Sequence, residues 1–529
     1  MPLDEVAGRK NIERYFLAGL VVACMALRLL QLHFRVVMFR DEASFAFLIK
    51  HMVDGTVLSD DSFYVFQPLL PIIAWPVAAV TKNPELAGRL VSILLGSLAV
   101  LPAYFLAKDM FGRKAAVASA VLTGLIQPLV LSSGSVMAEV PYAFTVLLGT
   151  YVAYRTYKAG SMVMYTLFGL VMGMSYLARP EGAVIFFFWS FFLGIIMLGK
   201  GVPLKSAATL LAVSVAAFFI LAMPYMALLK SHFGTWQLTG KTSVNMAYNK
   251  AIADTSPGSY DEKLAKYTQM ELQGAGGPGG VAEKVRGIVS RYPGNFVEEM
   301  KSIVTTTGYL PFAFAVLGLV LGARKRETWK SAGLLLLSFT PLLFIPMYHV
   351  LDRVVLPYAP LVFILSAAGT AGAASLLGRL RPSVKLLEHA ALTVILAAVI
   401  GPGLYSYCSM DPEGFLNLSP SLPGYYEYRL AGDELKKTLP PDSRIMTRNN
   451  MVAFYAGGEY VPFTTLGMED AWKYIVEKKV DYVVYGPLEQ YMRPEMRDLL
   501  SPEKAAGRYR LVYWQGEFLV YEVISQNGR

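Results

Sequence analysis

Two adjacent carboxylates, Asp41 and Glu42, follow the first hydrophobic run of the chain. Alone they are compatible with a solvated helix end, because acidic side chains cost little at a membrane interface. The next stretch, Ala43–Gly55, is weakly apolar and amphipathic, and such a segment can lie along a bilayer surface. A carboxylate at headgroup depth is partly desolvated, so its pKa rises and it can accept a proton from a hydroxyl. The pair therefore predicts an acid–base site at the membrane surface.

A third acid, Glu139, lies between two apolar runs and follows the small-residue segment 132–138. A helix start explains it equally well, because the N-terminal dipole favours an acidic first turn. If Glu139 faces Asp41, it could hold an acceptor, tune the base or bind a metal. The sequence leaves these roles open.

Basic side chains accompany the acids. Arg179 begins a turn that contains proline and glycine, and a guanidinium at a span end can bind a phosphate through two parallel hydrogen bonds. His349, Asp352 and Arg353 form a second cluster, for which an Asp352–Arg353 ion pair is an equally plain account. Lys50 is included only because it lies in the first loop. We predict that Arg179, Arg353, His349 and Lys50 bind a phosphate.

Several familiar signatures are missing from the sequence. There is no Walker loop, no HExxH, no GxSxG in a strand–turn–helix context and no CxxC pair. These absences disfavour nucleotide-driven transport and zinc proteolysis. The two cysteines, Cys24 and Cys408, supply neither a disulfide framework nor a spaced metal site.

The elements that must position these residues are membrane spans. The 529 residues are 54% hydrophobic and only 16% charged, and the mean hydropathy is +0.43. An ordinary soluble enzyme is more polar. The net charge of +9 lies largely in short loops, where it sets orientation and does not indicate nucleic acid. We predict an α-helical polytopic membrane protein.

The apolar runs predict about 11 spans. They are residues 13–34, 88–107, 114–133, 140–155, 163–178, 183–199, 205–229, 304–322, 331–348, 354–378 and 386–405. Basic clusters then fall in alternate connections, which places them and the N-terminus in the cytoplasm. The first run lacks a small-residue cleavage site, so we expect an uncleaved signal anchor.

This register requires that residues 67–80 do not cross the membrane. The segment contains prolines at 68, 71 and 76, and at about 14 residues it is too short for a span. We predict a re-entrant or interfacial helix within an external loop, 35–87. All of the acidic and basic site residues above then emerge on the extracytoplasmic face.

The predicted transmembrane domain, 1–404, contains a second external loop at 230–303. Two surface helices are expected there, at Tyr260–Leu272 and Val281–Ser290, joined by a glycine-rich link.

Residues 405–529 are expected to form a small extracytoplasmic α/β domain. Its predicted strands are Arg444–Thr447 and Val480–Tyr485, with a helix, Glu469–Lys479, between them. A hairpin of Tyr509–Tyr513 and Glu517–Val523 follows.

Four motifs occur in order: Asp-Glu-Ala at 41–43, Gln-Pro-Leu-Leu at 67–70, Gly-Arg-Leu at 88–90 and the segment 106–116. In order and spacing they resemble the GT-C superfamily of membrane glycosyltransferases, in particular the branch with protein O-mannosyltransferases and the lipid A aminoarabinose transferase. The likeness covers residues 10–200 well and continues loosely to the Leu-Pro pair at 356–357.

The resemblance implies a sugar donor linked through phosphate to a polyprenol, and transfer with inversion on the extracytoplasmic face. It assigns the general base to Asp41, the acidic neighbour to Glu42 and the second external acid to Glu139. Arg179 and Arg353 match no motif of the family. No cofactor is firmly implied, and a divalent metal stays open.

Two departures from the family concern the acceptor. Many relatives have His-Pro-Pro where this chain has Gln67-Pro68-Leu69, and the Trp-Trp-Asp motif of oligosaccharyltransferases is missing. A lipid or glycan acceptor is therefore favoured over a protein hydroxyl. The expected partners are the donor, that acceptor and membrane lipids, without nucleic acid, in a prokaryotic plasma (inner) membrane.

The alternative is a lipid-linked-sugar flippase or another secondary transporter. Transporters tend to place ionisable residues at the bilayer midplane on broken helices, often within inverted repeats. In this chain the ionisable residues gather at one face, which favours the enzyme.

Overall fold

The computed structural model describes residues 3–35, 37–60, 62–241, 263, 266–267, 281–322, 326–347, 350–380, 387–409, 425–463, 468–492, 494–505 and 507–524. Two compact units divide the chain. Unit 1 comprises Met1–Phe34, Leu58–Gly240 and Val281–Asp411, and unit 2 comprises Arg35–Val57, Lys241–Gly280 and Pro412–Arg529.

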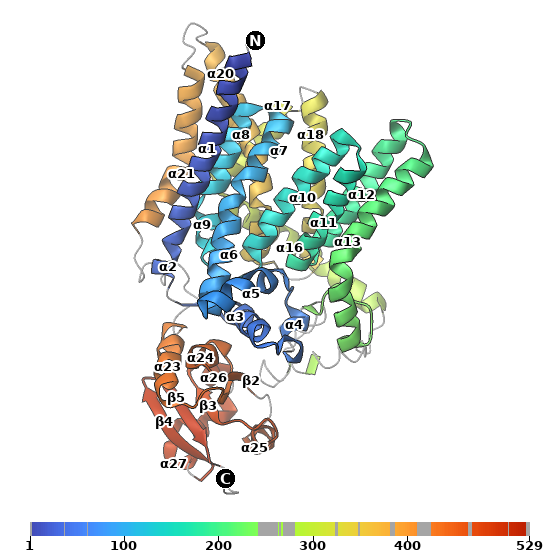
Figure 1. Ribbon diagram of the computed structural model, residues 1–529. Coiled ribbons are helices and arrows are strands. Elements are labelled where there is room, and N and C mark those ends of the chain that lie inside the picture. Colours follow the sequence, from blue (N-terminus) through green and yellow to red (C-terminus); the bar gives the residue numbers. More distant parts are fainter. Residues whose placement is uncertain are drawn as a thin grey trace. The chain divides into compact units, whose positions relative to one another are not determined.

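Unit 1 is helical, and Figure 1 shows its long helices aligned side by side. Its first half contains α1 (Leu3–Leu29), α2 (Gln31–Phe34), α4 (Ser62–Val65), α5 (Leu69–Thr81), α6 (Pro84–Leu98), α7 (Val100–Phe111), α8 (Arg113–Leu125), α9 (Gln127–Ser133), α10 (Glu139–Ala159), α11 (Met162–Ala178), α12 (Glu181–Gly199) and α13 (Leu204–Phe233). Its second half contains α16 (Val281–Thr307), α17 (Tyr309–Gly322), α18 (Arg326–Leu336), η2 (Leu337–Leu343), η3 (Ile345–Met347), α19 (Asp352–Val355), η4 (Leu356–Tyr358), α20 (Ala359–Leu380) and α21 (Leu387–Cys408).

Among the described residues, seven helices are long and apolar enough to cross a membrane, or up to nine if two bent pairs each count as one span. The sequence predicted about 11 spans. Two predicted spans are not among these long, apolar helices. They are α10, which is rich in tyrosine and threonine, and α11, which has 17 residues.

Two of the predicted spans are broken. The span predicted at 114–133 consists of α8 and α9, which meet at 49°, with Pro128 as the second residue of α9. The helix predicted at Val281–Ser290 continues to Thr307 as α16, and α17 follows at 106°. The predicted Tyr260–Leu272 helix lies largely outside the described residues.

The segment predicted to be too short for a span is α5. It has 13 residues and contains Pro76. The helix packs against α6 and α11 within unit 1.

Small residues allow the helices of unit 1 to approach closely. A Cβ at Gly169 of α11 would lie 2.1 Å from the Ser214 carbonyl oxygen of α13, and one at Gly369 of α20 would lie 1.9 Å from that of Phe314 in α17. Neither position can accept a side chain without moving a backbone, as at the small-residue contacts of membrane helices.

Unit 2 contains a five-stranded sheet in the order β2-β1-β3-β5-β4. Strands β1 (Arg444–Thr447), β2 (Glu459–Pro462) and β3 (Tyr482–Tyr485) are parallel, and β5 (Phe518–Val523) pairs antiparallel with both β3 and β4 (Tyr509–Gln515). The helices of this unit are α3 (Arg40–Asp54), α23 (Tyr425–Thr438), α24 (Asn450–Ala456), α25 (Met468–Glu477), α26 (Pro487–Met492), η5 (Pro494–Leu500) and α27 (Pro502–Ala505).

The strands, helix and hairpin predicted for the C-terminal domain are all present, whereas β2 and α24 were not predicted. The structure also differs from the predicted domain boundary in one respect. The segment Arg35–Val57, predicted as part of the first external loop of the transmembrane domain, belongs to the same compact unit as the sheet.

Candidate active site

An arginine between two carboxylates is the centre of the site in unit 1. Two hydrogen bonds join Arg179 to Glu181, from Nη2 to Oε1 at 2.9 Å and from Nε to Oε2 at 3.4 Å. On its other side, Arg179 Nη1 lies 3.6 Å from Glu139 Oε1. The guanidinium is therefore held in one orientation by two acids from different helices.

Local sequence explains this placement. Arg179 ends α11 in an extended conformation, with φ −155° and ψ 142°, because the residue before a proline avoids the helical region. Pro180 then starts α12, so that Glu181 lies in its first turn. Glu139 is the first residue of α10. Both acids thus lie at helix N-termini, where the helix dipole favours negative charge.

Two buried tyrosines extend the site. The Arg179 guanidinium lies 5.7 Å from the ring centroid of Tyr142, one turn after Glu139. The Tyr142 hydroxyl is 3.0 Å from that of Tyr358 in η4. Tyr358 thereby connects the start of α10 to the segment that precedes α20.

The group carries one cation and two carboxylates, all largely buried. Burial alone lowers the pKa of an arginine, but the carboxylates of Glu181 and Glu139 outweigh it and raise the pKa of Arg179. Arg179 is therefore charged at every working pH. Within this group of three side chains the carboxylates outnumber the cation, so a phosphate ligand favours a further cation nearby.

Of the other predicted phosphate ligands in unit 1, Arg353 lies in α19, five residues before Tyr358, the last residue of η4. The preceding residue, Asp352, accepts a hydrogen bond of 2.5 Å from Ser302 of α16. Since η4 contacts α10, the Arg353 segment reaches the Arg179 group through Tyr358. His349 lies outside the described residues.

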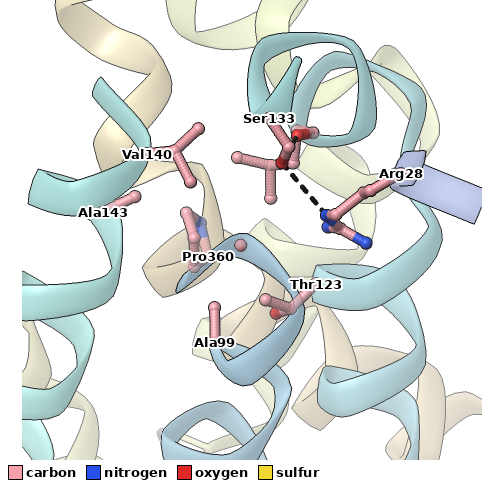
Figure 2. A pocket seen from close by; sticks show the side chains of 9 residues that line it. Arg28, Ala99, Thr123, Ser133, Val140, Ala143 and Pro360 are labelled. Carbon is pink, nitrogen blue, oxygen red and sulfur yellow. Dashed lines mark hydrogen bonds between the residues drawn. The ribbon is translucent and has the colours of Figure 1, made fainter. Parts of the chain in front are cut away.

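A second buried arginine fixes the helix that leads to Glu139. Arg28 of α1 is 1% exposed, and its Nε donates to Ser133 Oγ at 3.0 Å and its Nη1 to the Gly124 carbonyl at 2.7 Å. Figure 2 shows Arg28 and Ser133 beside a cavity of about 10 Å³ that Thr123 and Val140 also line. A cavity of this size is close to the smallest that can hold one water molecule. Arg28 therefore ties the first span to the end of α9, six residues before Glu139.

In unit 2, the two residues of the predicted catalytic pair, Asp41 and Glu42, lie in different environments. Glu42 is fully buried, forms an ion pair with Arg35 and accepts the Phe39 N–H at 3.4 Å, which caps α3. Asp41 lies half-buried in the first turn of the same helix. Glu42 thus fixes the start of the helix that carries Asp41.

Lys50, predicted as a phosphate ligand, is already bound by acids. Its ammonium lies 2.8 Å from Glu459 Oε1 and 3.8 Å from Asp442 Oδ1. His51 Nε2 lies 3.4 Å from the other oxygen of Glu459. These contacts join α3 to the start of β2.

Sequence reasoning did not select Glu181, Tyr142, Tyr358 or Arg28 as site residues, nor the buried acid Glu299. Tyr142 follows Glu139 by three residues and could have been found from helical spacing. Glu299 of α16 is fully buried, and neither of its oxygens has a hydrogen-bond partner in the described part of the chain. Its place in an otherwise polar helix gave no signal.

No group of three His, Cys, Asp or Glu side chains that could hold a metal ion occurs within the described ranges. Glu139 and Glu181 both approach the Arg179 guanidinium, which lies between them. We assign no metal ligands.

Comparison with known proteins identifies the architecture. Residues 67–227 match the model of the family described as dolichyl-phosphate-mannose-protein mannosyltransferase. No curated protein is significantly similar in sequence over the chain.

Solved structures are similar over most of the length. ArnT from Cupriavidus metallidurans bound to undecaprenyl phosphate is 12% identical with a TM-score of 0.62, over 97% of this chain and 98% of that one. The archaeal oligosaccharyltransferase AglB from Archaeoglobus fulgidus, in complex with an inhibitory peptide and a dolichol-phosphate, is 14% identical with a TM-score of 0.55, over 90% of this chain and 70% of that one. The resemblance to the GT-C superfamily and the predicted fold class, a helical membrane protein with a small C-terminal α/β region, are confirmed.

Proposed function

For a chain with the GT-C glycosyltransferase fold, we propose the transfer of a sugar from a polyprenyl-phosphate donor to a hydroxyl of a lipid, glycan or protein acceptor. The observation that carries this proposal is the likeness to ArnT over nearly the whole of both chains. The family match supports it, since residues 67–227 include both Glu139 and Arg179.

The proposed reaction is a single displacement at the anomeric carbon. The acceptor oxygen forms a bond to that carbon as the bond from the carbon to the phosphate oxygen breaks, and the phosphate leaves with the electron pair. The acceptor proton passes to the Asp41 carboxylate, and the anomeric configuration inverts. A positioned general base of this kind contributes a factor of about 10²–10⁴ in rate.

Arg179 is proposed to bind the departing phosphate. The phosphate gains charge as the bond breaks, so a fixed guanidinium in a buried site stabilises the transition state more than the bound donor. Glu139 and Glu181 hold that guanidinium in place without the need for solvent to reorganise.

The two carboxylates also create a requirement. Within this group two carboxylates accompany one guanidinium, so a phosphate anion favours further cations nearby. Arg353 and His349 are proposed to supply them, because Arg353 lies on the segment that reaches Tyr142 through Tyr358. Lys50 is left out of this role, since Glu459 binds its ammonium.

The sequence is the basis for proposing on which side of the membrane the reaction occurs and which acceptor is used. The basic loops predict a cytoplasmic N-terminus and an extracytoplasmic C-terminal domain. We propose that the chain resides in a prokaryotic plasma (inner) membrane and acts on its outer side. A lipid or glycan is the favoured acceptor.

The test uses the full-length protein purified in detergent. It is incubated with a panel of polyprenyl-phosphate sugars, labelled in the sugar, and the release of polyprenyl phosphate is measured. We expect turnover of at least one donor, and we expect Asp41→Asn to retain less than about a tenth of it. Glu522→Gln, a change on the C-terminal sheet, is the matched control.

A flippase or other transporter would release no polyprenyl phosphate when no membrane separates two compartments. Absence of release from every donor, with the protein folded, would therefore exclude the proposal. An Asp41→Asn enzyme of near-normal activity would instead remove the general base from the mechanism.

A further inference from the structure

We infer that Glu459 is a positioning residue for catalysis, which holds the helix that carries Asp41 against the C-terminal α/β domain. This inference rests on the proposed function of Asp41. It makes the C-terminal domain part of the catalytic apparatus, through a set of contacts that lie entirely within unit 2. We call the side chains Lys50, His51 and Glu459 the α3 clamp.

The clamp holds the second half of α3. Each carboxylate oxygen of Glu459 faces a different side chain, Lys50 Nζ at 2.8 Å from Oε1 and His51 Nε2 at 3.4 Å from Oε2. Lys50 is itself only partly exposed, at 25%, and His51 at 13%. Two neighbouring helix residues bound by one carboxylate limit both rotation and sliding of α3.

A second set of contacts holds the first half of α3 and the residues just before it. Asn450 Nδ2 donates to Ser44 Oγ at 2.8 Å, and the Met38 N–H donates to the Tyr455 hydroxyl at 3.3 Å. Between the two sets, the rings of Phe47 and Phe454 meet edge to face with centroids 5.3 Å apart. The partners come from α24 and the start of β2, so the whole length of α3 is attached to the domain.

Helical spacing relates these contacts to Asp41. At about 100° per residue, Ser44 and His51 lie roughly 60° and 80° around the helix from Asp41, and Lys50 lies on the opposite side, so the contacts hold α3 from more than one direction. A rotation or slide of the helix that broke the clamp would move the Asp41 carboxylate directly. Misplacement of a catalytic group by about 1 Å can cost on the order of 10² in rate.

The arrangement also decides between two roles for Lys50. As a phosphate ligand, Lys50 must be positive for the enzyme to work. As a clamp residue, it needs only a partner of opposite charge. Reversal of both charges, in the variant Lys50→Glu with Glu459→Lys, separates these roles.

The experiment has two readouts on the full-length protein in detergent. Hydrogen–deuterium exchange in peptides of residues 40–54 reports on the attachment of α3 and does not depend on any activity. Turnover of the best donor from the panel gives kcat, and binding of undecaprenyl phosphate gives the affinity for the lipid phosphate. Glu522→Gln, which removes a carboxylate paired with Arg510 on the same sheet, is the matched control.

We expect Glu459→Lys to speed exchange in residues 40–54 and to lower kcat by at least about tenfold, with the affinity for undecaprenyl phosphate within about twofold of the parent. The double reversal should restore part of both the slow exchange and kcat, because it re-forms the ion pair between positions 50 and 459 but not the contacts with Asp442 and His51. Unchanged exchange in the β1 and β3 peptides shows that the domain is folded. If the Glu459→Lys variant does not fold, Glu459→Gln replaces it in the same experiment.

Two results would overturn the inference. One is a Glu459→Lys variant with parental exchange and kcat. The other is a double reversal that restores slow exchange but not turnover, which would mean that Lys50 binds the donor phosphate. If no donor is turned over by the parent, the proposed function fails while the exchange data still report on the clamp.

Discussion

Asp41 and Glu42 are neighbours in sequence, yet their different surroundings suit them to different roles. The Glu42 carboxylate binds Arg35 and accepts the backbone N–H that it caps, so its contacts hold the start of α3. Asp41 is only half-buried in that first turn. The proposed division is therefore a structural acid that fixes the helix beside an acid that performs the chemistry.

The Arg179 group yields a prediction about geometry. Arg179→Lys keeps the charge but loses the planar guanidinium, which donates two hydrogen bonds to Glu181. We expect kcat/KM to fall by on the order of 10²-fold. Glu181→Gln keeps a hydrogen-bond acceptor for Arg179 and should retain activity within about tenfold.

The measurement is turnover of the labelled donor, with thermal unfolding to show that each variant is folded. A lysine variant as active as the parent would mean that Arg179 stabilises the site without contacting the phosphate. Equal losses of turnover in Arg179→Lys and Glu181→Gln would mean that activity depends on the whole Arg179–Glu181 network and not on the arginine alone.

Part of this site was visible in the sequence. Glu139 and Arg179 were singled out because an acid and an arginine at span ends are chemically informative. Their direct pairing was not predicted, since it joins the start of α10 to the end of α11. Glu181 was not predicted as a site residue, and Tyr358 lies more than 200 residues from its partner Tyr142, beyond what local spacing can relate.

At the scale of elements, the break between α8 and α9 is held in place by Arg28 and Ser133. Gly96 makes room for this contact, because a Cβ there would lie 2.5 Å from Ser133 Oγ. We expect Gly96→Ala to displace Ser133 and to destabilise the protein by about 1–3 kcal/mol, the cost of overpacking a buried contact.

Gly401→Ala in α21 is the matched control, because a Cβ there meets nothing within 4 Å. It should leave the thermal midpoint unchanged or raise it, since alanine is the better helix former. Thermal unfolding of both variants in one detergent is the measurement. A Gly96→Ala midpoint no lower than that of Gly401→Ala would show that the Arg28 contact tolerates displacement.

The elements that the sequence predicted well are those whose signal is local. Long apolar runs located the helices of unit 1, and β-branched and aromatic runs located β1, β3 and the hairpin. Strand β2 was missed because its four residues, Glu459–Pro462, include a charge and a proline. They become a strand through parallel pairing with β1, which is a tertiary effect.

The α3 clamp gives a prediction about pH. Hydrogen bonding from His51, and then from Lys50, lowers the pKa of Glu459 to about 2, although burial acts to raise it. A carboxylate whose pKa is lowered on folding stabilises the fold above its unfolded pKa, and this contribution is lost as the pH falls toward the folded value. The window for Glu459 therefore runs from about 4.5 down to about 2.

We expect the parent to lose more of its thermal stability between pH 6 and pH 3 than Glu459→Gln does. The effect is modest, because the Glu459 side chain is 39% exposed and solvent screens it. Thermal unfolding of both proteins across that range measures the difference. Parallel curves for the two proteins would contradict a charged clamp.

At the scale of the whole molecule, the chain does not divide where its hydropathy changes. Hydropathy predicted a boundary near residue 405, and the second unit does begin its last segment at Pro412. The same unit also includes Arg35–Val57, more than 350 residues earlier in the chain. That association depends on contacts such as Lys50 with Glu459, which no local pattern of a single sequence reveals.

The sidedness of the molecule depends on α5. Its 13 residues span about 20 Å at 1.5 Å per residue, which is short of the roughly 30 Å hydrocarbon core. We therefore predict that both ends of α5 face the same compartment. Single cysteines at Leu58 and Thr81, in a Cys24→Ala, Cys408→Ser background, should both react with a membrane-impermeant maleimide in intact spheroplasts.

A cysteine at Lys200, between α12 and α13, is the control and should react only after permeabilisation, because basic connections face the cytoplasm. If positions 58 and 81 reacted from opposite sides, α5 would cross the membrane. The basic loop that contains Lys108 and Arg113 would then lie outside, and Glu139 and Arg179 would face the compartment opposite to Asp41. A base on one side of a bilayer cannot serve a leaving phosphate on the other, so that labelling pattern would exclude the proposed displacement.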